Sequence, residues 1–287
     1  MTIEICLACG GRLIAVLPER VEGPFGHARG ALRQAQRAVP DGVVRQDGQV
    51  TTPGSDASNA DEIDRMPSRQ ASDSLLAVLT AGRWRPSAWV RFLVLTTRRS
   101  VATARAHPRA LAEVTALHAG MAFLSTRRGL PWIATSWFMA ATHLGMLNER
   151  ESIGVPNALT LARANLPAIE NRVGKWIPLI ALGSDFADGK IARATGAVTP
   201  FGSSADFLAD TAVWTWFTLR HENNRMLQLL TFAAWVAPVV GLTAASMARG
   251  KLVELPRSAW FRPAAVMEIV IGVRFVLTQL RGSRSSR

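Results

Sequence analysis

The stretch that decides the fold runs from Ser184 to Trp214 and reads SDFADGKIARATGAVTPFGSSADFLADTAVW. Its acidic residues, set among apolar and small neighbours, are Asp185, Asp188, Asp206 and Asp210. The first two are three positions apart and the last two are four apart, so each pair lies on one face of a helix. Between the pairs, Gly196, Pro200 and Gly202 interrupt helical structure and can reverse the chain. We therefore expect two antiparallel helices that bring the four carboxylates together.

Four carboxylates gathered in a medium of low dielectric constant repel one another and take up protons. Divalent cations that prefer oxygen ligands, such as Mg²⁺, Mn²⁺ or Ca²⁺, remove this repulsion, and a pair of them can clamp a diphosphate. On a helical wheel Gly189 and Arg193 follow Asp185 along one stripe, with Ala192 beside it. The two small residues leave room for a ligand, and the arginine can donate to phosphate oxygens. A salt-bridged helix pair explains one or two of the acids, but not the glycines beside them.

The composition indicates a membrane protein. Of the 287 residues, 48% are hydrophobic, yet the formal net charge is +12. Basic residues that flank apolar segments reconcile these two values. Nucleic-acid binding is the other usual explanation for a basic chain, but here the arginines are scattered between apolar runs. We therefore predict no nucleic-acid partner.

The apolar runs predict an all-α fold, a polytopic membrane helix bundle with amphipathic helices. The run Met226–Ala248 has no charged residue and is long enough for a hydrocarbon core about 30 Å thick. The runs Leu130–Asn148 and Ala259–Leu280 are also apolar, and no segment alternates with the period of a strand. In the last run, Glu268 and Arg274 are expected to face the bundle interior or each other.

The chain divides into three predicted regions. Residues 1–73 are rich in Gly, Pro, Ser and Asp and are expected to form a disordered N-terminal tail. Cys6 and Cys9 form a C-x-x-C without a second pair, so we interpret them as incidental thiols. Residues 74–150 are expected to form amphipathic and apolar helices whose arginines meet anionic headgroups or solvent. Residues 151–287 form the membrane domain that carries the aspartates.

Two motifs resemble one known family. The order Asp185-x₂-Asp188-Gly189-x₂-Ala192-Arg193-x₈-Gly202-x₃-Asp206-x₃-Asp210 resembles the signature of the CDP-alcohol phosphatidyltransferases, with every fixed position filled. VPNALTLAR, from Val155 to Arg163, resembles the Pro-Asn-x-x-Thr-x-x-Arg helix that precedes this signature. The resemblance covers about residues 153–280.

The resemblance implies a multi-pass enzyme of the cell membrane whose active site faces the cytoplasm. In phospholipid biosynthesis, it would use an alcohol acceptor to displace CMP from a CDP-diacylglycerol-like lipid. Its other partners would be membrane lipids, and the resemblance is compatible with a homodimer. Two divalent ions, Mg²⁺ or Mn²⁺, would be held by Asp185, Asp188, Asp206 and Asp210. Asp210 would also be the general base on the attacking hydroxyl. The residues implied to hold or line the nucleotide site are Gly189, Ala192, Arg193, Thr199, Gly202, Asn157 and Thr160.

The sequence departs from the family between the two motifs. A full membrane helix normally lies there, whereas ANLPAIENRVGK joins Arg163 to a helix that starts near Trp176. We hypothesise that helices upstream replace this span, or that residues 157–169 cross only partway. Nearby, Arg163, Arg172 and Lys190 could bind a phosphorylated acceptor or anchor the chain at the interface.

Two other functions remain open on the sequence alone. One is a non-catalytic membrane protein that retains a metal- or lipid-binding site; the intact Asp210 argues against it, because a structural site needs no general base. The other is a peripheral basic protein that binds polyanions; the uncharged run Met226–Ala248 argues against that.

Overall fold

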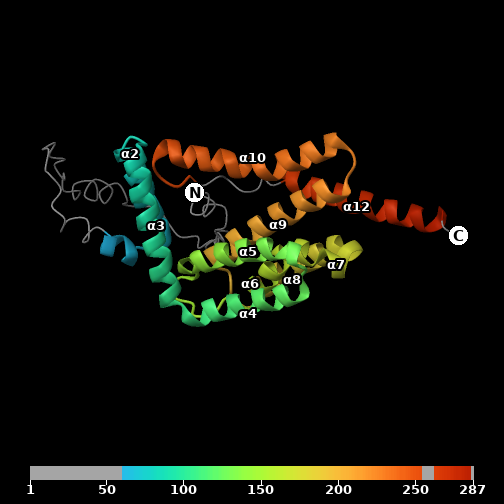
Figure 1. Ribbon diagram of the computed structural model, residues 1–287, viewed down its shortest axis with the longest axis horizontal. Helices are drawn as coiled ribbons and strands as arrows, with labels where there is room; N and C mark the ends of the chain where they lie inside the picture. Colours follow the sequence, from blue (N-terminus) through green and yellow to red (C-terminus); the bar gives the residue numbers. More distant parts are fainter. Residues whose placement is uncertain (1–59, 254–261, 286–287) are drawn as a thin grey trace, which may run out of the picture. The chain divides into compact units, whose positions relative to one another are not determined.

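The computed structural model describes residues 60–253 and 262–285, and every regular element within these ranges is a helix (Figure 1). The all-α prediction is therefore confirmed for the described residues. The elements, with η marking 3₁₀ helices, are α2 (Ser68–Ala81), α3 (Pro86–Ala106), α4 (Pro108–Leu124), η4 (Arg127–Gly129), α5 (Leu130–Thr142), η5 (Leu144–Leu147), α6 (Gly154–Ala164), η6 (Leu166–Ile169), α7 (Glu170–Val173), η7 (Gly174–Trp176), α8 (Ile177–Ala194), α9 (Pro200–His221), α10 (Arg225–Arg249) and α12 (Arg262–Ser285).

Helix α9 takes part in two hydrophobic clusters. In one, Trp214 and Phe217 of α9 are buried with Trp235 of α10 and Ile271 of α12. In the other, Phe201 at the start of α9 is buried with residues of α4, α5 and α6. Packing on both sides fixes the direction of α9, and with it the direction of the aspartates that it carries.

The predicted break between α8 and α9 is confirmed. Gly196, just after α8, has a φ of +61°, a left-handed conformation that glycine adopts without a steric penalty. Thr199 then caps α9, because its Oγ1 accepts a hydrogen bond from the Gly202 N–H at 3.0 Å. Pro200 occupies the first helical position, where its missing N–H costs nothing.

Helical structure begins ahead of the tail boundary expected at residue 73. Residues 60–65 are helical and α2 begins at Ser68. Ile63 is buried in a cluster with residues of α2 and α3, and the Arg99 guanidinium donates to the carbonyl of Ile63 and, at 2.8 Å, to that of Met66. The rest of the predicted tail, with Cys6 and Cys9, lies outside the described residues.

One helix among the described residues is long and apolar enough to cross a membrane. Helix α10 has 25 residues and its best window has a mean hydropathy of 1.7. Asn224 caps its start and left-handed Gly250 follows its end. The apolar run Leu130–Asn148, in contrast, is divided between α5, with 13 residues, and η5. The multi-pass arrangement therefore stays a prediction.

The connection between α6 and α8 is short, as the sequence predicted. It consists of η6, α7 and η7, and α6 itself has 11 residues. At 1.5 Å per residue α6 is about 17 Å long, well below the thickness of a hydrocarbon core. Helix α6 instead packs against α4, α8 and α9 (Figure 1). In α12, Arg274 pairs with Glu222 at 2.8 Å. Of the two arrangements expected for Glu268 and Arg274, the one in which they pair with each other is therefore not seen among the described residues.

Candidate metal and phosphate site

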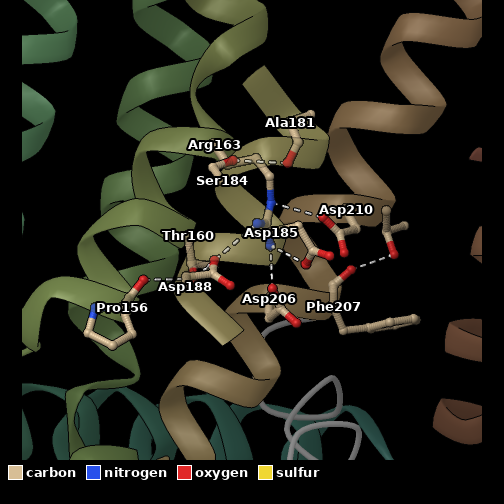
Figure 2. Close-up of polar contacts among 11 residues, drawn as sticks. Pro156, Thr160, Arg163, Ala181, Ser184, Asp185, Asp188, Asp206, Phe207 and Asp210 are labelled. Carbon is tan, nitrogen blue, oxygen red and sulfur yellow. Dashed lines mark hydrogen bonds and ion pairs between the residues drawn. The ribbon is translucent and has the colours of Figure 1, made fainter. Parts of the chain in front are cut away.

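Helix α6 places one arginine at the centre of the four aspartates (Figure 2). The Arg163 side chain is 0% exposed and forms ion pairs with Asp188 at 3.0 Å, with Asp210 at 2.9 Å and with Asp185 at 3.4 Å. It also pairs with Asp206. The four carboxylates thus meet, as the spacing of the acids predicted, but the guanidinium between them was not predicted.

Helix α6 can reach both acidic pairs because it contacts α8 and α9 together. Thr160 and Arg163 are three residues apart and lie on one face of α6. The Thr160 hydroxyl donates to Asp188 Oδ2 at 2.8 Å, and the Pro156 carbonyl lies 3.1 Å from the same hydroxyl. Asp188, with a side chain only 6% exposed, is therefore held by two residues of α6.

The site opens to one side. The side chains of Asp185 and Asp206 are 46% and 42% exposed, whereas that of Asp210 is 15% exposed. One oxygen from each of these three carboxylates lies within 4.8 Å of the other two. A cation that approaches from the open side would meet Asp185 and Asp206 first and Asp210 behind them.

The donor set fits a hard divalent cation. One guanidinium faces four carboxylates, which leaves a negative excess. Arg163 Nε and Asp210 Oδ1 are both buried without a hydrogen-bond partner, because their 2.9 Å ion pair lacks the alignment of a hydrogen bond. A buried polar atom left in this way is destabilising. Carboxylate oxygens in this number are suitable ligands for Mg²⁺ or Mn²⁺.

Helices upstream of the motifs hold the end of α6 that carries Arg163. Trp132 of α5 donates from its indole to the Ala164 carbonyl at 2.8 Å. The Asn165 side chain donates to Ser136 Oγ at 3.0 Å, and a ring nitrogen of His118 lies 3.0 Å from the same oxygen. These partly buried contacts join α4, α5 and α6. They are consistent with the hypothesis that upstream helices substitute structurally for the family's missing span.

Three residues predicted to bind the nucleotide lie together between α6 and α9: Asn157, Thr199 and Gly202. Asn157 and Thr199 are 4% and 5% exposed, and the Asn157 amide lies 3.5 Å from Thr199 Oγ1. A Cβ at Gly202 would lie 2.3 Å from Asn157 Oδ1. The structure thus gives these residues a part in joining α6 to α9, and their contact with a nucleotide stays a prediction.

Gly189, Ala192 and Arg193 lie on α8, next to the aspartates in sequence. The Arg193 guanidinium lies over Gly189, since a Cβ there would be 3.2 Å from Arg193 Nη1. Arg193 is exposed and makes no ion pair within the described part of the chain. Its charge is therefore available to an anion.

Three basic residues near the motifs, Arg163, Arg172 and Lys190, lie in different surroundings. Arg163 lies inside the site, a position that the sequence analysis missed; its three-residue spacing from Thr160 places both on one face of α6 but does not show what that face contacts. Arg172 donates to the Leu124 carbonyl at 2.9 Å, and Lys190 lies 5.8 Å from the centre of the Phe186 ring. Neither of these two pairs with the aspartates.

The family comparison agrees with the motifs. The model of the CDP-alcohol phosphatidyltransferase family matches residues 153–284, a segment that begins just before α6 and holds every site residue described above. No curated protein and no solved structure matches the chain. Over residues 153–284, slightly less than half of its length, the chain is therefore similar to the CDP-alcohol phosphatidyltransferase family.

Proposed function

We propose that this chain transfers a phosphatidyl group from a CDP-diacylglycerol-like lipid to an alcohol and releases CMP. The family acts on CDP-alcohols and alcohol acceptors. The observation that carries the proposal is the convergence of four carboxylates from α8 and α9 on one point. A basic protein that binds polyanions requires no such arrangement.

The aspartates would hold two divalent ions, Mg²⁺ or Mn²⁺. Asp185, Asp206 and Asp210 form the group whose oxygens lie close enough to share an ion, and Asp188 would contribute to the second. When bound, such ions stabilise the negative charge that develops on a diphosphate.

Asp210 would act as the general base. Its Oδ1 faces Arg163 Nε in a 2.9 Å ion pair but accepts no hydrogen bond from the described residues, so it would be able to accept a proton from the hydroxyl of the acceptor. The hydroxyl oxygen then attacks the phosphorus of the phosphatidyl group. The bond from this phosphorus to the bridging oxygen breaks, and CMP leaves with the electron pair. The reaction needs no covalent enzyme intermediate.

Arg193 would bind the diphosphate. It is exposed, it makes no ion pair among the described residues, and it lies over a glycine that leaves the backbone open. A guanidinium donates to phosphate oxygens in a fixed geometry. The open side of the site, at Asp185 and Asp206, would then admit the nucleotide.

The setting would be the cell membrane, with the site facing the cytoplasm and the product entering phospholipid biosynthesis. Helix α10 supports this, because it is a candidate span and exposes Leu229, Phe232 and Val240 to the surroundings. Exposed apolar side chains on a helix of this length are suited to lipid.

The test is CMP release from CDP-diacylglycerol by purified protein in detergent, with Mg²⁺ or Mn²⁺ and a panel of alcohols. Asp210→Asn removes the proposed base and is expected to slow release by about 10²–10⁴-fold. Asp64→Asn removes a carboxylate that pairs with Arg98, away from the site, and should leave the rate unchanged. Folded protein that binds Mn²⁺ but releases no CMP with any alcohol would overturn the proposal in favour of a non-catalytic metal site.

A further inference from the structure

The position of Arg163 raises a question about the metal site itself. The guanidinium pairs with Asp185, Asp206 and Asp210, the same three residues whose oxygens lie within 4.8 Å of one another. A cation that binds all three carboxylates needs direct contact with these oxygens. The guanidinium already contacts them from within the cluster.

Two cations close together among these oxygens would repel each other, more strongly where water is excluded. The Arg163 side chain is 0% exposed, so solvent does not screen its charge. A divalent ion bound to these three carboxylates would therefore be repelled by the guanidinium in its present position. We propose that Arg163 is the internal counter-ion of the metal-free site and competes with the divalent cation for Asp185, Asp206 and Asp210.

The contacts of Asp188 provide an anchor for this exchange. Asp188 lies outside the three-residue metal group, and it pairs with Arg163 through Nη1, whereas Asp185 and Asp206 pair through Nη2 and Asp210 through Nε. Thr160 holds the same carboxylate from α6. Arg163 can thus release three carboxylates while it retains the Nη1 contact with Asp188.

The ion pair between Arg163 and Asp210 can be exchanged for a metal ion without the loss of a hydrogen bond. Arg163 Nε and Asp210 Oδ1 are buried at 2.9 Å from each other, yet neither has a hydrogen-bond partner. An ion that takes Asp210 as a ligand satisfies its oxygen and breaks no hydrogen bond there. The inference rests on the proposed function, because it concerns the metal centre of the same site, but it predicts metal affinity and not turnover.

The test is the binding of Mn²⁺ alone, without lipid or alcohol, to the purified full chain in detergent. Electron paramagnetic resonance of the free ion gives the dissociation constant. Arg163→Gln removes the competing charge, and we expect it to bind Mn²⁺ about tenfold or more tightly than the wild type does. Arg172→Gln removes an arginine that donates to the Leu124 carbonyl and forms no ion pair with the aspartates among the described residues, and its affinity should equal that of the wild type.

Arg163→Lys keeps a charge in the same place but loses the fork that reaches all four carboxylates. Its affinity for Mn²⁺ should lie between those of the wild type and Arg163→Gln. If Arg163 instead shapes the site for the metal, both variants bind Mn²⁺ less tightly. Equal or weaker binding by Arg163→Gln would show that the two cations do not compete.

Stability without metal provides a second readout. Arg163→Gln leaves the four carboxylates without their cation, so its melting temperature should fall below that of the wild type and recover in Mn²⁺. A variant that remains unfolded with and without Mn²⁺ contradicts the inference, because the ion then fails to replace the guanidinium. Tighter Mn²⁺ binding by Arg163→Gln, together with a wild type that releases no CMP, would support the inference and overturn the proposed function.

Discussion

The side chain of Asn157 in α6 packs against the backbone of Gly202 in α9. A Cβ at position 202 would lie 2.3 Å from Asn157 Oδ1 and 3.2 Å from Thr199 Oγ1. The glycine of the signature is therefore required by close packing between the helix that carries Arg163 and the helix that carries Asp206 and Asp210. This explains the residue without any reference to a nucleotide.

Gly202→Ala should destabilise the protein by about 1–3 kcal/mol, because the added methyl group forces Asn157 or the start of α9 to move. Denaturant unfolding in detergent measures the loss, and the rate of CMP release should fall with it as α6 and α9 separate. Gly120→Ala is the matched control. A Cβ at Gly120 of α4 meets nothing within 4 Å, so this change should be neutral or stabilise by about 0.4–1 kcal/mol. Equal effects of the two substitutions would contradict the packing explanation.

Thr160→Val should destabilise the folded protein by about 1–3 kcal/mol, because it removes the hydroxyl that donates to the buried Asp188 carboxylate at 2.8 Å. Valine matches threonine in shape, so packing changes little. Thr160→Ser keeps the hydroxyl and should retain most of the stability in the same unfolding experiment. If serine and valine are equally damaging, the methyl group and not the hydrogen bond is what matters at this position.

The meeting of the four acidic residues could be predicted from the sequence, because their spacing is a local property of helices. The break at Gly196 and Pro200 was equally local, and α8 and α9 end and begin there. Arg163 was placed only as one of three nearby cations. Its burial depends on α6 packing between α8 and α9, a relationship among segments distant in sequence that residue spacing does not encode.

The helix at residues 60–65 was missed for a similar reason. Its composition resembles that of a solvated tail, and its order comes from distant partners. Arg98 of α3 pairs with Asp64 at 3.1 Å, and Arg99 donates to the backbone carbonyl of Ile63. Ile63 is then buried beside α2 and α3. Such tertiary contacts outweigh a weak local preference for helix.

Addition of Mn²⁺ should raise the melting temperature of the wild type, since an ion that binds only the folded state stabilises it. At a free concentration of a hundred dissociation constants the gain is about 2.7 kcal/mol. Asp206→Asn removes one of the three grouped carboxylates and should abolish most of the rise, and EDTA should reverse it in the wild type. Differential scanning calorimetry in detergent makes the measurement. An unchanged melting temperature in the wild type would argue against a metal site.

Arg193→Gln should raise the KM for the CDP-linked lipid about 10–100-fold, the loss expected when a charge-assisted hydrogen bond to phosphate is removed. The effect should be smaller on kcat, because Arg193 makes no contact with Asp210 in the described structure. Steady-state rates of CMP release at varied lipid concentration separate the two constants. Arg220→Gln is the control: Arg220 pairs with Glu170 at 3.3 Å, and its loss should leave the KM unchanged. A normal KM in Arg193→Gln would remove this residue from the nucleotide site.

Acid should weaken the junction between α4 and α6 through Glu113. Burial raises the pKa of Glu113, but hydrogen bonds from Ser152, from the Ile153 N–H and from Arg109 outweigh it, so the pKa lies below the ordinary value of 4.5. A carboxylate with a lowered pKa stabilises the folded state fully above its unfolded-state pKa, and this contribution is lost as the pH falls through the folded-state value. The wild type should therefore melt above Glu113→Gln at pH 7, and the difference should shrink below about pH 4.5. Thermal melting of both proteins across this range measures the effect. A difference that stays constant with pH would mean that the charge of Glu113 does not stabilise the junction.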